Sequence, residues 1–222
     1  MIRRNIFFLL IFFFITFTSY NFSEQKNNAS FIFPIKKIIV ENTFIVDSIK
    51  LNKKLEFLKN SSLFFLDEKS ITSVVDKFDF ISSIQLKKKY PYTLKILVSE
   101  DIPVATKIDG KKKYYLTKEG KKINYVEKKA FKDIPTIFGD YKNFSSFFYE
   151  LEKSNFKINT VKAFYYFDIG RWDIVLKDKR IIKLPVNNYQ KILIKIDSIL
   201  DEYSFSKYKI FDYRINDRLV LK

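Results

Sequence analysis

The stretch Ile81-Ser-Ser-Ile-Gln-Leu-Lys-Lys-Lys-Tyr-Pro-Tyr-Thr-Leu-Lys-Ile-Leu-Val-Ser99 alternates apolar and polar residues with a period close to two. This alternation predicts two half-buried β-strands, at residues 81–88 and 93–99. The four residues from Lys89 to Tyr92 predict a turn between them, because Pro91 has no N–H group to donate to a strand ladder. We therefore expect a β-hairpin here, and the residues before it complete a compact unit.

Two helical patterns precede the hairpin. Asp47 and Asp67 are placed to cap them, because a side-chain carboxylate accepts hydrogen bonds from the first free N–H groups of a helix. The apolar stripes are Leu51, Leu55 and Leu58 in the first helix, up to about Lys59, and Ile71, Val74, Val75 and Phe78 in the second. With a strand at residues 35–40, the order becomes β-α-α-β-β. The prediction is three strands with two helices across one face.

The remaining half of the chain is rich in short strand patterns. We expect helices at residues 144–153 and 189–203, and an apolar loop at residues 134–139. The expected strands are 104–108, 114–116, 123–126, 160–167, 172–176, 180–184, 208–214 and 218–221. Because hairpin turns separate most of these strands, a mixed, mostly antiparallel sheet is expected. The fold class is α+β.

The first 22 residues indicate export. Arg3 and Arg4 precede an uncharged stretch, residues 6–22, which as a helix spans roughly 26 Å at about 1.5 Å per residue. Arginines in the short segment before a transmembrane helix favour an N-terminus that stays in the cytoplasm. A cleaved signal peptide is the alternative, with only Thr16-x-Thr18 resembling its cleavage site. We favour a retained transmembrane helix, and both alternatives place the rest of the chain outside the cytoplasm.

Composition excludes several classes of enzyme. The chain has no cysteine and no histidine, which removes thiol nucleophiles, Cys-ligated zinc and every Ser-His-Asp mechanism. No Gly-rich phosphate loop, no metal-spaced cluster and no serine elbow is present. We predict a protein that is not an enzyme and has no cofactor, no metal site and no catalytic residue.

The formal net charge of +16 would ordinarily favour nucleic acid or an anionic surface as partner. The lysines are scattered along nearly every segment, however, and no aromatic-basic nucleic-acid motif accompanies them. A genome-wide bias towards Lys, Asn, Ile and Phe codons explains the excess more simply. We therefore predict no nucleic-acid partner.

Six short segments occur along the chain in the same order as the sequence motifs of a known protein family. They are Ile84–Ala105, with Tyr90-Pro91 and Glu100-Asp-Ile-Pro103; Tyr114–Ile123, with Gly120; Ile134-Pro-Thr-Ile-Phe-Gly139; Arg171-Trp-Asp-Ile-Val-Leu176; Ile182-Lys-Leu-Pro185; and Asp212-Tyr-Arg-Ile-Asn-Asp-Arg-Leu219. With the anchor and the β-α-α-β-β unit, they resemble the FtsQ/DivIB family of bacterial cell-division proteins. The Arg-Trp-Asp and Asp-Arg-Leu forms are most similar to its alphaproteobacterial branch.

This resemblance implies a domain layout. Residues 1–5 would be cytoplasmic, 6–22 a transmembrane helix, 23–30 a linker, 31–101 a POTRA domain and 102–222 a β domain. The family usually has glycine in the first strand-to-helix turn, where this chain has Asn42; asparagine tolerates the left-handed backbone, so we expect the turn to be kept. The protein would be a single-pass inner-membrane protein at the division septum, with both domains in the periplasm.

The resemblance also implies a function and partners. The chain would be a bitopic scaffold of the division machinery (the divisome) that links early and late division proteins. It would bind the FtsB–FtsL coiled-coil pair through its β domain and contact other divisome membrane proteins. Two alternatives stay open: a POTRA-type periplasmic chaperone or assembly factor for envelope proteins, and a carboxylate-dependent wall hydrolase.

For the partner-binding site we expect strand addition at the last hairpin, because an edge strand presents unpaired N–H and C=O groups. Trp172 is interpreted as a core residue and Arg171 as its exposed neighbour. Glu100 is expected to pair with backbone or a lysine, and the charges between Asp212 and Arg218 with each other across strands in solvent. The predicted partner-binding residues are Arg171, Arg214, Ile215, Asn216, Asp217, Arg218, Leu219, Val220 and Leu221.

Overall fold

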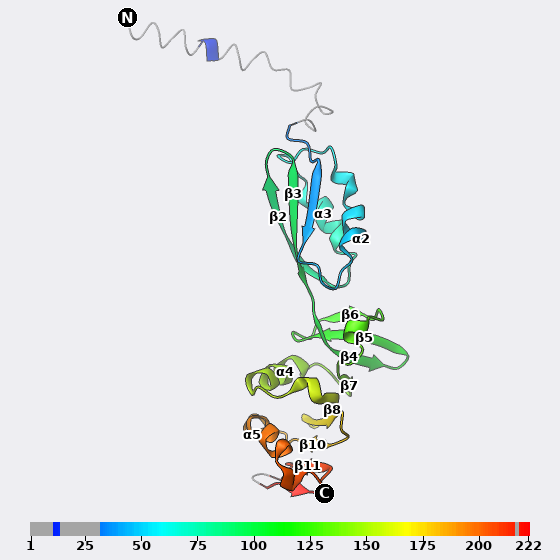
Figure 1. Ribbon diagram of the computed structural model, residues 1–222, viewed down its shortest axis with the longest axis vertical. Helices are drawn as coiled ribbons and strands as arrows, with labels where there is room; N and C mark the ends of the chain where they lie inside the picture. Colours follow the sequence, from blue (N-terminus) through cyan, green and yellow to red (C-terminus); the bar gives the residue numbers. More distant parts are fainter. Residues whose placement is uncertain (1–10, 14–31, 216–217) are drawn as a thin grey trace, which may run out of the picture. The chain divides into compact units, whose positions relative to one another are not determined.

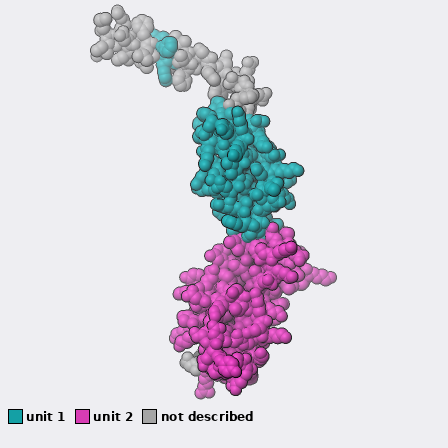
Figure 2. Space-filling view, viewed as in Figure 1, with its two compact units in different colours: residues 1–100 teal, residues 101–222 magenta. Residues whose placement is uncertain are grey.

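The computed structural model describes residues 11–13, 32–215 and 218–222 (Figure 1). The chain divides into two compact units, residues 1–100 and 101–222, called unit 1 and unit 2 here (Figure 2). Ile11–Phe13 is helical, and the rest of the predicted transmembrane helix, residues 6–22, lies outside the described residues, as do the predicted cytoplasmic residues 1–5 and linker 23–30. No helix within the described ranges is long and apolar enough to cross a membrane.

Unit 1 has the β-α-α-β-β order that the sequence predicts. Its elements are β1 (Lys37–Glu41), α2 (Ser48–Lys54), a 3-10 turn (Glu56–Leu58), α3 (Glu68–Val75), β2 (Ile81–Lys89) and β3 (Thr93–Glu100). The strands lie in the order β1-β3-β2, with β1 parallel and β2 antiparallel to β3. Both helices lie on one face of this sheet (Figure 1).

The helix starts of unit 1 confirm the predicted caps. The Asp47 carboxylate accepts hydrogen bonds from the N–H groups of Ile49 and Lys50, at 2.9 and 3.1 Å. Asp67 accepts one from Lys69 N–H at 3.1 Å. Asn42 has a φ of +63°, so asparagine does adopt the left-handed conformation at the first strand-to-helix turn. These side chains satisfy N–H groups that a helix start leaves without a partner.

The core of unit 1 is aliphatic. Its cluster of buried residues contains only isoleucine, leucine and valine: Ile35, Ile38, Leu51, Leu55, Leu58, Leu63, Ile71, Val75, Ile81, Leu94, Ile96 and Val98. Val74 and Phe78, predicted to face this core, pack against it while partly buried. Both predicted helix stripes therefore contact the sheet.

Glu100 at the end of β3 binds backbone, which is one of the two roles expected for it. Its carboxylate accepts hydrogen bonds from the N–H groups of Phe44 at 3.0 Å, Ile45 at 2.9 Å and Val46 at 2.8 Å. One side chain thereby satisfies three successive N–H groups in the segment between β1 and α2. The contact joins the last strand of the unit to the turn after its first strand.

Unit 2 is a mixed sheet with two longer helices. Its strands are β4 (Pro103–Asp109), β5 (Lys112–Thr117), β6 (Lys122–Asn124), β7 (Thr136–Phe138), β8 (Val161–Phe167), β9 (Arg171–Leu176), β10 (Ile181–Lys183), β11 (Ile210–Asp212) and β12 (Val220–Leu221), and its α-helices are α4 (Phe144–Lys153) and α5 (Gln190–Asp201). Short 3-10 turns cover Lys129–Phe131, Ile158–Thr160 and Tyr203–Phe205. The strand order is β12-β11-β10-β9-β8-β7-β4-β5-β6. Three neighbouring pairs, β4·β7, β7·β8 and β10·β11, are parallel and the others antiparallel, so the α+β, mostly antiparallel prediction is confirmed.

The apolar loop predicted at residues 134–139 is wrong. Residues 136–138 form β7, which joins β4 to β8 through parallel pairing on both sides. Gly139 directly after it has a φ of +87°, and a Cβ atom there would lie 2.2 Å from the backbone oxygen of Tyr166. Glycine is required because the chain must leave β7 in a left-handed conformation against the backbone of β8.

The core of unit 2 combines aliphatic and aromatic side chains. Trp172 is buried, as predicted, and its ring stacks on Phe147 of α4 with centroids 4.5 Å apart and planes 8° from parallel. Phe164 of β8 meets Phe147 edge-on at 5.6 Å. From α5, Leu193, Ile196 and Leu200 are buried in the same cluster. α4 therefore attaches to the sheet through aromatic contacts and α5 through aliphatic ones.

Candidate partner-binding site

β12 lies at one end of the strand order of unit 2 and pairs with β11. The register places Leu221 opposite Phe211, while Ile210 and Lys222 exchange backbone hydrogen bonds of 2.9 and 3.1 Å. In an antiparallel ladder, successive residues direct their N–H and C=O groups to opposite sides. The N–H and C=O of Leu221 therefore face away from β11, which is the arrangement that accepts a further strand.

A charged row crosses the three strands beside this edge. Register aligns Lys183 of β10 with Asp173 of β9 on one side and with Asp212 of β11 on the other. The two aspartates are only 6% and 7% exposed. Because side chains alternate along a strand, this row lies on the sheet face opposite to Trp172 and Ile174, which pack in the core of unit 2.

Arg171 and Arg214 flank the row. Arg171 Nε donates to Asp173 Oδ1 at 3.1 Å, and its guanidinium lies 4.1 Å from the centroid of the Phe167 ring. Arg214 makes a bidentate contact with Asp212, through Nε at 2.8 Å and Nη2 at 2.6 Å. Side-chain exposure is 15% for Arg171 and 42% for Arg214. The prediction that Arg171 is exposed is therefore wrong, because its side chain packs on Phe167 and pairs with Asp173. Arg214 is the more accessible of the two cations.

The two aspartates respond oppositely to their surroundings. Hydrogen bonds from Arg214 lower the pKa of Asp212, and the same contact raises the pKa of Arg214. Burial raises the pKa of Asp173, although Arg171 and Lys183 act against this shift. Asp212 is therefore a well-compensated carboxylate, whereas burial disfavours the charged form of Asp173.

The solvated cross-strand pairing expected for the charges at the closing hairpin is wrong for Asp212. That side chain is buried, and it pairs with Arg214 two residues further along its own segment. An aspartate two residues before an arginine carries no sequence signal for burial, because burial here follows from the parallel neighbour β10. Asn216 and Asp217, also predicted to contact the partner, lie outside the described residues.

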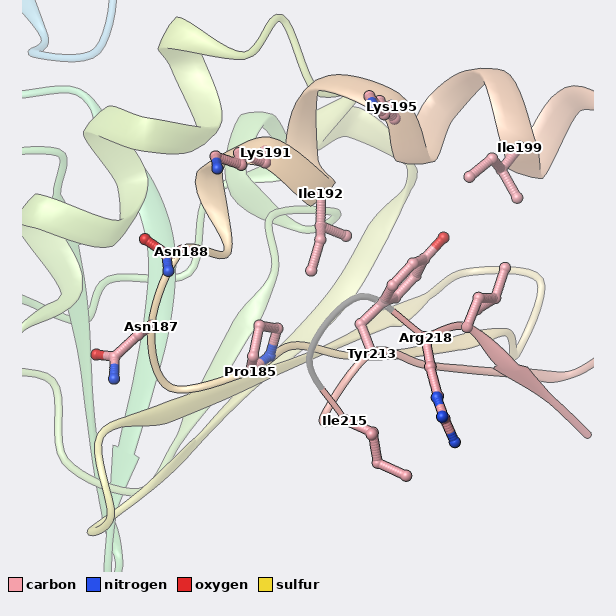
Figure 3. Close-up of a pocket in the computed structure, with 11 residues that line it drawn as sticks. Pro185, Asn187, Asn188, Lys191, Ile192, Lys195, Ile199, Tyr213, Ile215 and Arg218 are labelled. Carbon is pink, nitrogen blue, oxygen red and sulfur yellow. The ribbon is translucent and has the colours of Figure 1, made fainter.

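A pocket of about 450 Å³ opens between α5 and the segment that joins β11 to β12 (Figure 3). Its apolar lining residues are Ile192 and Ile199 of α5 together with Ile215 and Leu219. The remaining lining residues are Pro185, Asn187, Asn188, Lys191, Lys195, Tyr213 and Arg218. The pocket therefore combines apolar walls with three cationic side chains.

Tyr213 projects into this space towards α5 (Figure 3). Its hydroxyl is buried, and the described part of the chain supplies no hydrogen-bond partner for it. Burial raises the pKa of Tyr213 to about 12, so the hydroxyl stays protonated at neutral pH. A buried hydroxyl without a partner costs free energy, which an acceptor entering the pocket would recover.

The structure distributes the predicted partner-binding residues over three adjoining features. Val220 and Leu221 form the edge strand, Ile215, Arg218 and Leu219 line the pocket, and the two arginines, 171 and 214, flank the charged row. Sequence reasoning missed Lys191, Lys195 and Tyr213. The two lysines are spaced i,i+4 on a helix otherwise interpreted only by its apolar face.

Comparison with known proteins shows which domain family unit 1 resembles. The family model for the POTRA domain, FtsQ-type, matches residues 33–101, which span the β-α-α-β-β elements. Matches to proteins named cell division protein FtsQ extend beyond that domain into the large sheet. Unit 1 is therefore similar to FtsQ-type POTRA domains, and most of the chain is similar to FtsQ proteins. The resemblance to the FtsQ/DivIB family is thereby confirmed, with Asn42 in place of the usual glycine.

Among the FtsQ relatives, that of Rickettsia typhi is 25% identical over 194 residues, covering 86% of this chain and 73% of the relative. The FtsQ of Syntrophotalea carbinolica is 29% identical over 119 residues, covering 53% of this chain and 42% of the relative. The solved extracytoplasmic domain of DivIB from Geobacillus stearothermophilus is similar at 13% identity and a TM-score of 0.33, covering 46% of this chain and 92% of that domain.

The described residues show no group of three or more acidic side chains that could hold a metal ion. What they do show is a sheet edge, a basic apolar pocket and paired charges.

Proposed function

We propose that this chain is a single-pass inner-membrane scaffold of the division machinery at the septum, where it links early and late division proteins. Two observations support the proposal: the FtsQ-type POTRA domain of unit 1, and the uncharged segment 6–22 after Arg3 and Arg4. The segment has the composition of a membrane anchor, and the arginines favour a cytoplasmic N-terminus with both units in the periplasm. The POTRA domain would add contacts to other divisome membrane proteins.

The partner of unit 2 is proposed to be the FtsB–FtsL pair, bound by addition of a strand to β12. The observation that carries this proposal is the outward direction of the Leu221 N–H and C=O groups at the end of the sheet. Main-chain hydrogen bonds to such an edge give affinity, and neighbouring pockets give specificity.

Charge would select the partner segment. A strand laid along β12 runs beside a pocket that carries Lys191, Lys195 and Arg218. These cations complement an acidic segment, and the apolar pocket walls complement an apolar side chain within it. Arg171 and Arg214 stand near the same edge on the row beside β11, where they would steer association.

The test compares two substitutions at one position. Leu221→Pro removes the outward N–H, whereas Leu221→Ala shortens the same side chain and keeps the N–H. We expect Leu221→Pro to raise the Kd for FtsB–FtsL by about tenfold or more relative to Leu221→Ala, because at least one interchain hydrogen bond is lost. Calorimetry measures the affinities, and Trp172 fluorescence checks that unit 2 stays folded. Equal affinities for the two variants would rule out strand addition at this edge.

A further inference from the structure

One end of unit 1 exposes a group of large apolar side chains. They come from the start of the unit, from the segment before α3 and from the turn between β2 and β3: Ile32, Phe33, Phe64, Phe65, Tyr90 and Tyr92. Each is between 43% and 58% exposed. We call these residues, with Lys36, Lys88 and Lys89, the aromatic–basic end.

Ring packing and backbone hydrogen bonds hold these three segments together. Phe33 and Tyr90 meet edge-to-face with centroids 5.0 Å apart. The N–H of Leu63 donates to the Phe33 carbonyl at 2.9 Å, which fixes the segment before α3 beside the start of the unit. The start of β1 joins the same end, because Lys36 N–H donates to the Tyr92 carbonyl at 2.9 Å. The group is therefore one continuous surface at the end of unit 1 where the β2–β3 turn lies (Figure 1).

The lysines lie among the rings. Lys36 Nζ is 5.9 Å from the centroid of Tyr92, and Lys88 Nζ donates to the Phe64 carbonyl at 3.3 Å. Lys89 is exposed at the end of β2. The carboxylate nearest in sequence, Asp67, is occupied in capping α3. The surface thus combines apolar rings with positive charge.

Backbone conformation adds an independent observation. Phe33 has a φ of +51°, an uncommon and strained value for a bulky residue. The ring of Phe33 nevertheless remains 43% exposed against Tyr90. A strained residue that gains little burial indicates a surface whose use lies outside the unit.

We propose that the aromatic–basic end docks on the surface of an anionic lipid bilayer. Aromatic rings and lysines are the residues that favour the bilayer interface, where rings enter the headgroup region and lysines meet anionic lipids. Docking by unit 1 goes beyond the proposed scaffold function but rests on its membrane anchor. It would hold the POTRA domain in one orientation at the membrane.

The short connection between segment 6–22 and unit 1 favours the bilayer as the partner of the aromatic–basic end. Ile32, a member of the surface, follows segment 6–22 after nine residues, 23–31, and nine extended residues span at most about 32 Å. Because Ile32 belongs to the surface, the chain enters unit 1 at the end that bears the rings and lysines. The anchor would keep the aromatic–basic end within this distance of the bilayer, so a protein partner would have to compete with the bilayer for this surface.

The experiment uses the full chain in lipid nanodiscs that contain a headgroup-attached quencher. The chain has no cysteine, so one introduced cysteine carries the fluorophore: Ser61→Cys beside the aromatic–basic end, or Lys77→Cys near the start of β2. The nine residues of β2 separate these ends by roughly 30 Å. We expect quenching at residue 61 but not at residue 77, stronger in discs with phosphatidylglycerol than with phosphatidylcholine alone, and weaker at high salt.

Matched variants assign the effect to the surface. Lys88→Gln with Lys89→Gln should lower the ratio of docked to undocked chains by roughly 30-fold, because each lysine near an anionic surface contributes about a factor of five. Phe64→Ser with Phe65→Ser should also abolish quenching. Phe44→Ser and Lys77→Gln are the controls, because Phe44 is 92% exposed beside Glu100, away from the surface, and they should leave quenching unchanged.

Each other outcome counts against the proposal. Equal quenching at residues 61 and 77, or quenching that the paired variants leave intact, would overturn it. Loss of capture of a division protein by these variants, with quenching unchanged, would assign the surface to a protein instead. A chain that does not stay in the discs would contradict the anchor of the proposed function. Docking would then be decided by flotation of the same chain with phosphatidylglycerol vesicles, where equal flotation of parent and paired variants contradicts it.

Discussion

Unit 1 and unit 2 fill their cores with different kinds of side chain. The buried cluster of unit 1 is entirely isoleucine, leucine and valine, with Phe80 buried outside that cluster. The cluster of unit 2 includes Trp172 and six phenylalanines: Phe144, Phe147, Phe148, Phe156, Phe164 and Phe211. In a chain with 25 phenylalanines, codon bias alone would not sort them this way. The rings of unit 1 are therefore mostly on its surface, whereas unit 2 buries many of its rings in the core.

The size of the elements explains part of this difference. α2 and α3 are 7 and 8 residues long and cover a three-stranded sheet, so they enclose a small volume that branched aliphatic side chains fill. α4 and α5 have 10 and 12 residues and cover a wider sheet. Aromatic rings bury more area per side chain and can span such a layer.

Removal of a ring from unit 2 should have the largest effect. Phe147→Ala should destabilise unit 2 by about 3–5 kcal/mol, because it removes the stack on Trp172 and leaves a cavity. Trp172 is the only tryptophan, so its fluorescence follows unfolding of unit 2 in denaturant.

The matched control is an exposed ring in unit 1. Phe44→Ala should change stability by no more than about 0.5 kcal/mol, since surface substitutions rarely do more. If both variants melted alike by circular dichroism, the contrast between the two cores would be wrong.

The two units also differ in how far the sequence predicts them. In unit 1, Asp47 and Asp67 marked both helix starts, and the alternation from residue 81 marked the hairpin. These signals are local, so a single sequence contains them. β7 in unit 2 was missed because three residues between Pro135 and Gly139 look like a loop. Its strand character comes from β4 and β8, which approach it from distant parts of the chain.

Only part of the candidate site could be predicted from the sequence. The position of the last strand in the sequence was enough to suggest an edge, and the structure places β12 at one end of the sheet. The charged row was not predictable, because it depends on parallel pairing between β10 and β11, which the helix α5 separates in sequence. The pocket likewise requires α5 to lie against the closing segment.

A carboxylate at the end of unit 1 should contribute the next largest effect. Glu100→Gln replaces one acceptor oxygen by an NH2 group that cannot accept from the N–H groups of residues 44–46. We expect a loss of about 1–3 kcal/mol in the stability of unit 1, because a partly buried donor is left unpaired. Glu41→Gln is the control, since Glu41 makes one partly exposed ion pair with Lys95, a type worth about 0–1 kcal/mol. Equal losses, measured by thermal unfolding, would contradict a special role for Glu100.

Substitution of the two buried aspartates of unit 2 should change the stability at pH 7 in opposite directions. The pKa of Asp212 is lowered in the folded chain, so its charge stabilises the fold above the pKa of the unfolded chain, about 3.9. That stability is lost as the pH falls through the lowered folded value. Asp212→Asn should therefore cost about 1–3 kcal/mol at pH 7, and the difference from the parent should shrink in acid.

Asp173→Asn should behave in the opposite way. Burial raises the pKa of Asp173, so its charged form destabilises the fold at neutral pH, and protonation relieves this as the pH falls through the raised value. An uncharged asparagine should leave stability at pH 7 equal to or above that of the parent, and the two curves should meet below about pH 4. Denaturant unfolding followed by Trp172 fluorescence from pH 7 to pH 3 checks both variants. If Asp173→Asn lost as much stability at pH 7 as Asp212→Asn, the ion pair with Arg171 would outweigh burial, and the assigned direction of the Asp173 pKa would be wrong.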